Sequence, residues 1–285
     1  MEKEYEVAVI GGGHAGAEAA LAAARCGAKT LLITSSKAAI GRMPCNPAVG
    51  GLAKSHLVYE IDALGGEMGK NADATALSAK TLNTSRGPAV RATRTQCAKA
   101  EYAARMRSVV ENQPGLDVLE DSATGFDVEG GVCKGVLTKG GGRIAAKCTV
   151  VTAGTSLRGR IWIGKDGEDG GGDGREAANE LSEAIERLGF TMIRLKTGTP
   201  PRLKASSCDF SKCLRQDGEN PRPLFHVEQF AGSGRSPNCS TWNNLEEKPQ
   251  RTQRETKPSD LCVHCGSNPS TTQNCSTWNN LEGGG

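Results

Sequence analysis

The sequence predicts an α/β fold built on a parallel sheet, and its first forty residues carry the main observations. Four consecutive apolar residues, Val7–Ile10, predict a buried strand of such a sheet. Gly11–Gly13 follow at once, and an alanine-rich run then predicts a helix over Ala17–Cys26. Gly27 predicts the end of that helix, and Ala28–Thr34 supplies a second apolar strand. This order of strand, glycine turn, helix and strand is typical of a Rossmann-like dinucleotide-binding unit.

The glycine turn has the G-x-G-x-x-G spacing, with Gly11, Gly13 and Gly16 at the three glycine positions. Gly11 is expected to make the turn, Gly13 to let the backbone approach a pyrophosphate, and Gly16 to let the helix pack close to the strand. A purely structural turn is the alternative interpretation. The predicted phosphate ligands are backbone N–H groups at the positive end of the helix, on Gly12, Gly13, His14, Ala15 and Gly16.

The end of the second strand departs from the general pattern of dinucleotide sites. An Asp or Glu commonly binds the ribose about 20 residues after the glycines. Here the strand runs into Thr34-Ser35-Ser36-Lys37, which contains no acid. The hydroxyl groups could hydrogen-bond the ribose, so the motif predicts a dinucleotide without deciding which one.

A loop of fixed shape is predicted after this unit. Pro44 and Pro47 bracket Cys45-Asn46, and Gly50-Gly51 close the segment before a helix predicted over Lys54–Leu64. A cysteine in such a loop could be a nucleophile or redox thiol at a cofactor, or a small packing residue. The local sequence leaves both interpretations of Cys45 open.

Three arginines, Arg86, Arg91 and Arg94, surround an ordered turn at Gly87-Pro88. A helix is predicted from this region through about Glu111, and the three-residue spacing would place Arg91 and Arg94 on one helix face. Recognition of phosphate, on a cofactor or on RNA, is one interpretation. A solvated basic surface is the other.

Short strands and loops are predicted in the second half of the chain. The segments Leu116–Leu119, Gly125–Glu129 and Val132–Thr138 predict a small β-meander inserted into the main sheet. Ile144–Val151 predicts a strand that runs into the small residues Thr152–Thr155, as a close approach to a cofactor requires. A flexible loop over Gly164–Gly174, an amphipathic helix over Glu176–Leu188 and a strand over Met192–Leu195 complete the expected order.

Composition narrows the class of protein. The formal net charge of +3 over 285 residues argues for no particular partner, and eleven scattered cysteines favour reduced thiols over a disulfide framework. No apolar run approaches the ~20 residues that cross a bilayer, and the first strand begins so early that no signal peptide is expected. Residues 231–285 are rich in polar residues and repeat Asn-Cys-Ser-Thr-Trp-Asn-Asn-Leu-Glu at 238–246 and 274–282, which predicts a disordered tail. Its Cys262-x-x-Cys265 pair fits no common zinc spacing, and no metal site is predicted.

Several longer motifs together resemble the MnmG (GidA) family of flavoproteins. They are Ile10–Ala20, Met43–Gly51, Glu60–Lys70, Leu82–Arg94 and Leu195–Arg202, with Cys208–Ser211 and Gly218–Pro221 further on. The resemblance runs from about residue 5 to about residue 228. It implies an enzyme that uses FAD, with NADH as reductant, to modify the wobble uridine of tRNA by 5-carboxymethylaminomethylation. It also implies a cytoplasmic homodimer that works with the GTPase MnmE.

The resemblance assigns expected roles along the chain. Cys45 becomes the candidate catalytic thiol, and Arg86, Arg91 and Arg94 become candidates for tRNA or phosphate contact. The implied organisation is a glutathione-reductase-type FAD-binding domain over 1–203 that is incomplete at its C-terminus, the start of an NADH-binding region over 204–230, and the tail over 231–285. The residues expected at the FAD, beyond the glycine turn, are Thr34, Ala123, Ala153, Gly154 and Thr155.

Three other interpretations remain open at this stage. The chain could be a non-catalytic FAD-binding or interaction fragment, because the family's second half is not recognisable in it. It could be a generic FAD-dependent oxidoreductase for a small substrate. It could also be a degenerate product without a stable core.

Overall fold

The computed structural model describes residues 4–43, 46–172, 174–198, 201 and 203–226. The chain divides into two compact units, of which the first contains residues 1–198 and 218–229 and the second residues 199–217 and 230–285. The predicted tail over 231–285 and the candidate thiol Cys45 lie outside the described residues. The predicted domain boundaries therefore remain predictions.

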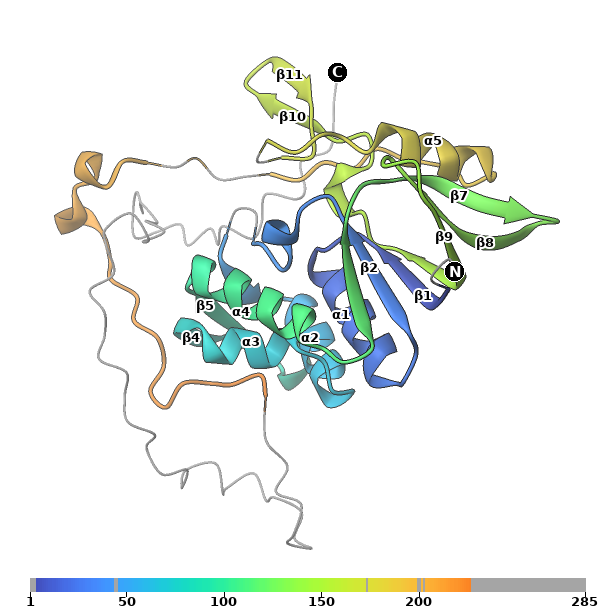
Figure 1. Ribbon diagram of the computed structural model, residues 1–285. Helices are drawn as coiled ribbons and strands as arrows, with labels where there is room; N and C mark the ends of the chain where they lie inside the picture. Colours follow the sequence, from blue (N-terminus) through green and yellow to red (C-terminus); the bar gives the residue numbers. More distant parts are fainter. Residues whose placement is uncertain (1–3, 44–45, 173, 199–200, 202, 227–285) are drawn as a thin grey trace, which may run out of the picture. The chain divides into compact units, whose positions relative to one another are not determined.

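The first unit is built on a six-stranded sheet of order β6-β2-β1-β9-β8-β7 (Figure 1). The strands β6, β2, β1 and β9 run parallel to one another, and β8 and β7 continue the sheet in antiparallel pairing. The strands β1 and β2 are short and apolar. Their register pairs Val7 with Thr30 at one end and Ile10 with Ile33 at the other. The bounds are β1 Tyr5–Ile10, β2 Thr30–Thr34, β6 Leu116–Glu120, β7 Ala123–Glu129, β8 Val132–Thr138 and β9 Arg143–Val151.

The predicted β-meander is only partly correct. β7, β8 and β9 form it, but Leu116–Leu119 belongs to β6, which pairs in parallel with β2 at the opposite edge of the sheet. The reason is the helix before it, α4 (Lys99–Glu111), which packs on β6 and on α1. A helical crossover of this kind returns the chain to the start of the sheet, so the next strand enters parallel to its neighbours.

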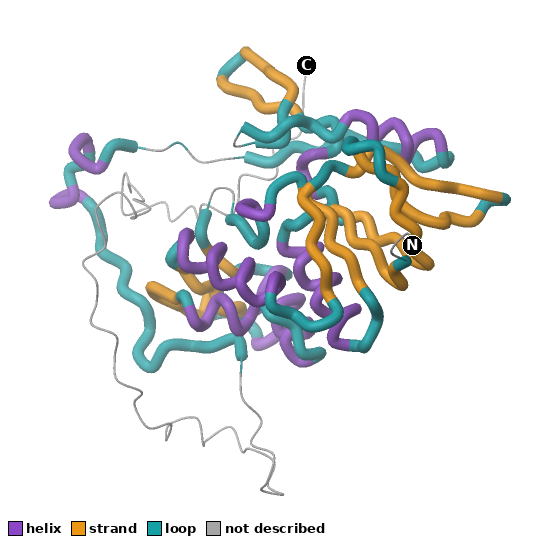
Figure 2. The backbone as a smooth tube through the Cα atoms, in the orientation of Figure 1, coloured by secondary structure: helices purple, strands orange, loops and turns teal. Residues whose placement is uncertain are grey.

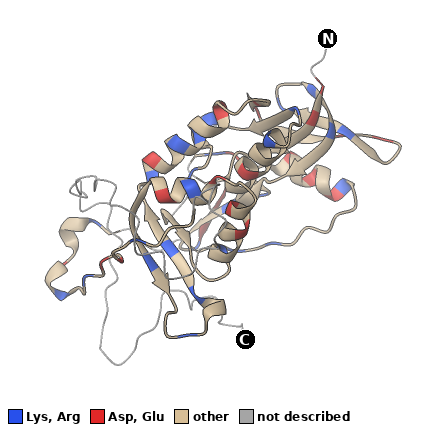
Figure 3. Ribbon diagram, turned by 90° about the horizontal axis from the view of Figure 1, so that it is seen from below, with Lys and Arg blue, Asp and Glu red and all other residues tan. Residues whose placement is uncertain are grey.

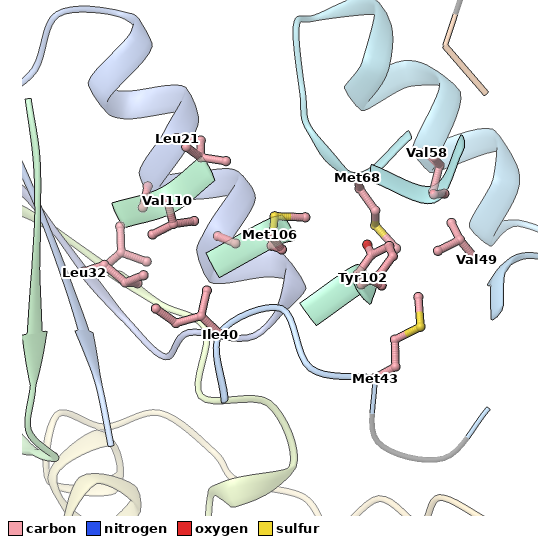
Figure 4. Close-up of a cluster of buried hydrophobic side chains, with 14 of the residues drawn as sticks. Leu21, Leu32, Ile40, Met43, Val49, Val58, Met68, Tyr102, Met106 and Val110 are labelled. Carbon is pink, nitrogen blue, oxygen red and sulfur yellow. The ribbon is translucent and has the colours of Figure 1, made fainter. Parts of the chain in front are cut away.

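Two apolar clusters cover the two faces of the sheet, because alternate side chains of each strand point to opposite faces. On one face Val9 and Leu32 pack under α4 and α1 (His14–Arg25), as the close-up in Figure 4 shows for Leu32. On the other face Ile10 and Ile33 pack with Val136 of β8 and Leu181 of α5 (Asn179–Arg187). β1 and β2 are therefore buried on both sides, which explains the apolar runs Val7–Ile10 and Leu31–Ile33.

A smaller three-stranded antiparallel sheet accompanies the main one, with order β3-β5-β4 (Figure 2). Its strands are β3 (Ala48–Gly50), β4 (Ala76–Leu82) and β5 (Ala92–Cys97). The helices α2 (Lys54–Ala63) and α3 (Met68–Ala74) pack on it. Their side chains Val58 and Met68 join the same cluster as Leu32, so the small sheet and the main sheet share one core.

Two further predictions about elements are wrong. The segment Gly164–Gly174 is not loop throughout, because β11 (Asp166–Asp169) pairs in a hairpin with β10 (Arg160–Ile163). Met192–Leu195 does not form a strand, and Ile193 and Leu195 are exposed. A strand needs hydrogen-bonded neighbours, and this segment is paired with none of the described strands.

Ion pairs connect three helices of the first unit. The carboxylate of Glu67, only 6% exposed, lies 2.9 Å from Arg25 of α1 and 2.7 Å from Arg105 of α4. Glu18 of α1 accepts the backbone N–H groups of Glu67 at 3.0 Å and of Met68, so it satisfies free donors at the start of α3. α1, α3 and α4 are thereby held in a fixed arrangement beside the sheet.

Residues Gly218–His226 belong to the first unit, although an excursion of the chain into the second unit separates them from it in sequence. Phe225 is 2% exposed, and its ring centre lies 5.2 Å from that of Tyr59 on α2. The carboxylate of Asp73 accepts the backbone N–H groups of Phe225 and His226, at 2.9 and 2.7 Å. In the second unit, the described residues contain two short 3₁₀ turns, Ala205–Ser207 and Phe210–Lys212.

Candidate dinucleotide-binding site

The three glycines of the turn each meet a different steric demand. Gly11 has φ +105, and a Cβ there would lie 2.6 Å from the carbonyl oxygen of Thr152. A Cβ on Gly16 would overlap the carbonyl oxygen of Gly11, so α1 can approach β1 this closely only with glycine. A Cβ on Gly13 would meet no atom of the described residues within 4 Å. The open space is therefore above Gly13, where the motif predicts the pyrophosphate.

Free backbone donors line the same space. α1 begins at His14 with Gly13 as its N-cap, and the first intrahelical bond runs from Ala17 N–H to Gly13 O at 2.8 Å. Within the described part of the chain, the preceding N–H groups, on Gly12 through Gly16, find no acceptor. Gly13 and Ala15 are also exposed. Free donors at a helix N-terminus form an anion site, which fits a diphosphate.

Thr152, at the end of β9, fixes the turn from the neighbouring strand. Its hydroxyl donates to the carbonyl of Ile10 at 2.7 Å and lies 3.1 Å from that of Gly11. Its backbone N–H also donates to Ile10 O at 2.8 Å. The sequence interpretation placed the segment Thr152–Thr155 at the cofactor but gave Thr152 no role in fixing the glycine turn. Its position between the apolar end of β9 and Ala153-Gly154 was the signal available.

The carboxyl ends of the parallel strands bring the other predicted cofactor residues to one edge. Thr34 ends β2, and a Cβ on Gly12 would lie 2.7 Å from its hydroxyl. Ala153 lies beside Gly11, and the exposed Gly154 and Thr155 follow it. Ala123 begins β7 two residues after Asp121, whose N–H donates to Thr34 O at 2.9 Å. Ligands of open α/β sheets bind at this edge.

His14 lies at the start of α1 with its ring against Tyr102, 5.5 Å between ring centres. Its Nε2 atom is buried and has no hydrogen-bond partner among the described residues. Burial, together with the positive charge of Lys54, lowers the pKa of His14 to about 4. The imidazole is therefore neutral at pH 7 and adds no charge to the phosphate site.

We expect acid to destabilise the chain through His14. Its pKa is lower in the folded state than the usual value of 6.5. Between these values the unfolded chain binds a proton that the folded chain does not, so the free energy of unfolding falls as pH falls. The difference between the wild-type chain and His14→Gln, measured by urea unfolding, should change by about 1–2 kcal/mol between pH 7.5 and pH 5. Parallel pH profiles for the two chains would contradict this account.

The predicted helix face for Arg91 and Arg94 is wrong. Arg94 lies in β5, paired with Gly50 of β3 and Lys80 of β4, and α4 begins only at Lys99. The β-branched Thr93 and Thr95 favour a strand here, and partners on both sides complete it. Arg86, Arg91 and Arg94 are all exposed. Lys80 was not predicted, and it is brought beside Arg94 by strand pairing alone.

Figure 3 shows acidic and basic positions interspersed along the helices of the chain. Arg94 and Lys80 differ from this pattern, because they are like charges on paired positions of neighbouring strands. No acidic side chain among the described residues pairs with either of them. Like charges directly opposite each other destabilise a sheet unless an anion lies between them.

Cys45 lies outside the described residues, but the flanking Met43 is buried in the core and Ala48 starts β3. The buried Cys97 thiol has its pKa raised to about 11 by burial, so it is unreactive. Among the described residues no group of three or more His, Cys, Asp and Glu side chains is placed to hold a metal ion. No described helix is both long and apolar enough to cross a membrane.

Comparison with known proteins decides the family. The family described as glucose inhibited division protein A matches residues 6–268. The chain belongs to this family. Its relatives include proteins called tRNA uridine 5-carboxymethylaminomethyl modification enzyme MnmG, from Geobacter sulfurreducens (52% identical over 224 residues) and Bacillus subtilis (48% over 225 residues). Each alignment covers 79% of this chain and 36% of the relative, so the chain spans about a third of the length of these relatives.

Solved structures of the glucose inhibited division protein A family have the same fold. GidA from Aquifex aeolicus superimposes with a TM-score of 0.75 at 46% identity, over 79% of this chain and 37% of that protein. A GidA-related protein from Thermus thermophilus, 24% identical, shares the fold with a TM-score of 0.50. The resemblance to the MnmG (GidA) family and the Rossmann-like α/β fold class are thereby confirmed.

Proposed function

We propose that this chain is the FAD-binding N-terminal part of an enzyme that modifies the wobble uridine of tRNA by 5-carboxymethylaminomethylation. The observation that carries the proposal is the open cradle of free N–H groups over Gly13, at the carboxyl edge of a parallel sheet. Relatives about half identical to the chain have the name of this tRNA-modifying enzyme. The free N–H groups favour a bound dinucleotide, and membership of the family favours FAD as that dinucleotide.

The residues present fit the diphosphate of FAD. Backbone donors on Gly12–Gly16 would hold it, while Thr34, Ala123 and Ala153–Thr155 would line the rest of the nucleotide along the same edge. The neutral His14 would add no charge beside the diphosphate. When bound, FAD supplies the electron-transfer chemistry, for which we propose NADH as the reductant.

The tRNA contacts are proposed on the small sheet. Arg94 and Lys80 form an uncompensated basic pair on β5 and β4, with Arg91 and Arg86 exposed nearby in sequence. Such a pair suits backbone phosphates of RNA, which bind arginine and lysine without regard to sequence. β3, which pairs with β5 at Gly50, begins at Ala48, three positions after Cys45, our proposed reactive thiol. We further propose a cytoplasmic homodimer that works with the GTPase MnmE.

The absorbance spectrum of the purified chain, after FAD is added and free FAD removed, tests this proposal. We expect a bound-flavin spectrum with about one FAD per chain, and a tRNA transcript that binds with an affinity that falls as salt rises. Simultaneous replacement of Arg86, Arg91 and Arg94 by alanine should weaken tRNA binding and leave FAD uptake unchanged. A colourless chain would contradict the FAD assignment, and unchanged tRNA binding by the triple variant would contradict the assignment of the arginines.

A further inference from the structure

The missing ribose acid at the end of β2 has a replacement on the neighbouring strand. Thr34, the last residue of β2, is paired in register with Glu120, the last residue of β6. Both strands are parallel, so the two residues end at the same edge of the sheet. In the usual dinucleotide-binding motif the ribose acid lies on the second strand itself, about 20 residues after the glycines. Glu120 is 86 positions after Thr34, so the motif does not point to it.

The carboxylate of Glu120 reaches back over the segment that leaves β2. Its Oε2 accepts the backbone N–H of Lys37 at 3.2 Å, and Lys37 is only three residues beyond Thr34. Among the described residues, the other oxygen of this carboxylate has no hydrogen-bond partner, and Glu120 is exposed. One acceptor therefore remains available at the place where the usual acid would stand.

The neighbouring polar groups are less suited to the ribose. Thr34 is 4% exposed, and its hydroxyl lies 3.2 Å from the carbonyl of Ser36, which accepts its proton. The carboxylate of Asp121 already accepts the N–H groups of Ser122 at 2.7 Å and Gly140 at 3.2 Å. Glu120 is the carboxylate at this edge with an acceptor still free among the described residues.

We propose that Glu120 binds the ribose hydroxyls of the adenosine part of FAD, in place of the acid that other dinucleotide sites carry at the end of the second strand. The inference rests on the proposed FAD site and adds to it a residue from a different strand. A hydrogen bond from a ribose hydroxyl to a charged carboxylate contributes roughly tenfold to affinity. The bond to Lys37 holds the carboxylate in place before the ligand arrives.

The test compares FAD with analogues that lack the 2′- or the 3′-hydroxyl of the adenosine ribose. Each is titrated into the purified 285-residue chain, and bound flavin is followed by its absorbance and fluorescence. The wild-type chain should bind FAD roughly tenfold more tightly than at least one analogue. Glu120→Ala should bind FAD about as weakly as that analogue and should lose the discrimination. Glu120→Gln, which keeps an acceptor without charge, should retain part of it.

Glu129→Ala is the matched control, since Glu129 is an exposed acid at the far end of β7 and should leave both affinities unchanged. If Glu120 only supports the segment at Lys37, the alanine variant will weaken all three ligands equally and keep the discrimination, which overturns the inference. A Glu120→Ala chain with wild-type affinity for FAD also overturns it. Failure of the wild-type chain to bind FAD contradicts the proposed function itself, and this inference with it.

Discussion

Gly16→Ala is expected to disrupt the nucleotide-binding turn, whereas Gly13→Ala should leave the fold intact and weaken FAD binding. The methyl group of an alanine at position 16 would overlap the carbonyl oxygen of Gly11 and lie 2.7 Å from the Thr152 hydroxyl. The Gly11 backbone on one side and the hydrogen-bonded Thr152 hydroxyl on the other leave the added methyl group no space to move into. We expect the free energy of unfolding to fall by about 3 kcal/mol, at the upper end of the usual cost of overpacking.

The same methyl group at position 13 would meet no atom of the described residues within 4 Å. It would project into the space that we assign to the pyrophosphate, so the affinity for FAD should fall at least tenfold, or about 1.4 kcal/mol. Urea unfolding without FAD and titration with FAD separate the two effects. A Gly13→Ala chain with normal FAD affinity would show that the pyrophosphate does not approach there, and a stable Gly16→Ala chain would show that the turn can relax.

Phe225→Ala is expected to lower the free energy of unfolding by about 3 kcal/mol, the usual cost of removing a buried aromatic ring. The ring is 2% exposed and lies against the ring of Tyr59 on α2, 5.2 Å between ring centres. Because Asp73 holds only the backbone of Phe225 and His226, its hydrogen bonds cannot replace the lost packing. Urea unfolding of the two chains measures the difference.

Phe190→Ala is the control for this prediction, since it removes the same side chain from a position that is 64% exposed. We expect it to change the free energy of unfolding by no more than about 0.5 kcal/mol, as is usual for surface positions. If Phe225→Ala were equally mild, residues 218–226 would not be an integral part of the first unit.

The order of elements around the cofactor edge could be predicted from the sequence because it depends on local signals. The unbroken apolar run of β1, the glycines after it and the alanine-rich α1 are near neighbours in the chain, and each of them favours a single conformation. The same local logic assigned a distinct role to each of Gly11, Gly13 and Gly16. The mistaken helix face of Arg91 and Arg94 marks the limit, because Arg94 becomes a strand residue only through its partners on β3 and β4.

The sequence by itself determined that a nucleotide-binding turn begins this chain and which family the chain resembles. Only the tertiary structure decided which distant residues meet that turn. Thr152 hydrogen-bonds to the turn, and Glu120 lies beside Thr34, 86 positions away in sequence. On the small sheet, strand pairing likewise places Lys80 beside Arg94, 14 positions away. The physical reason is that strand pairing sets these neighbours through a register of backbone hydrogen bonds, which no local pattern of side chains encodes.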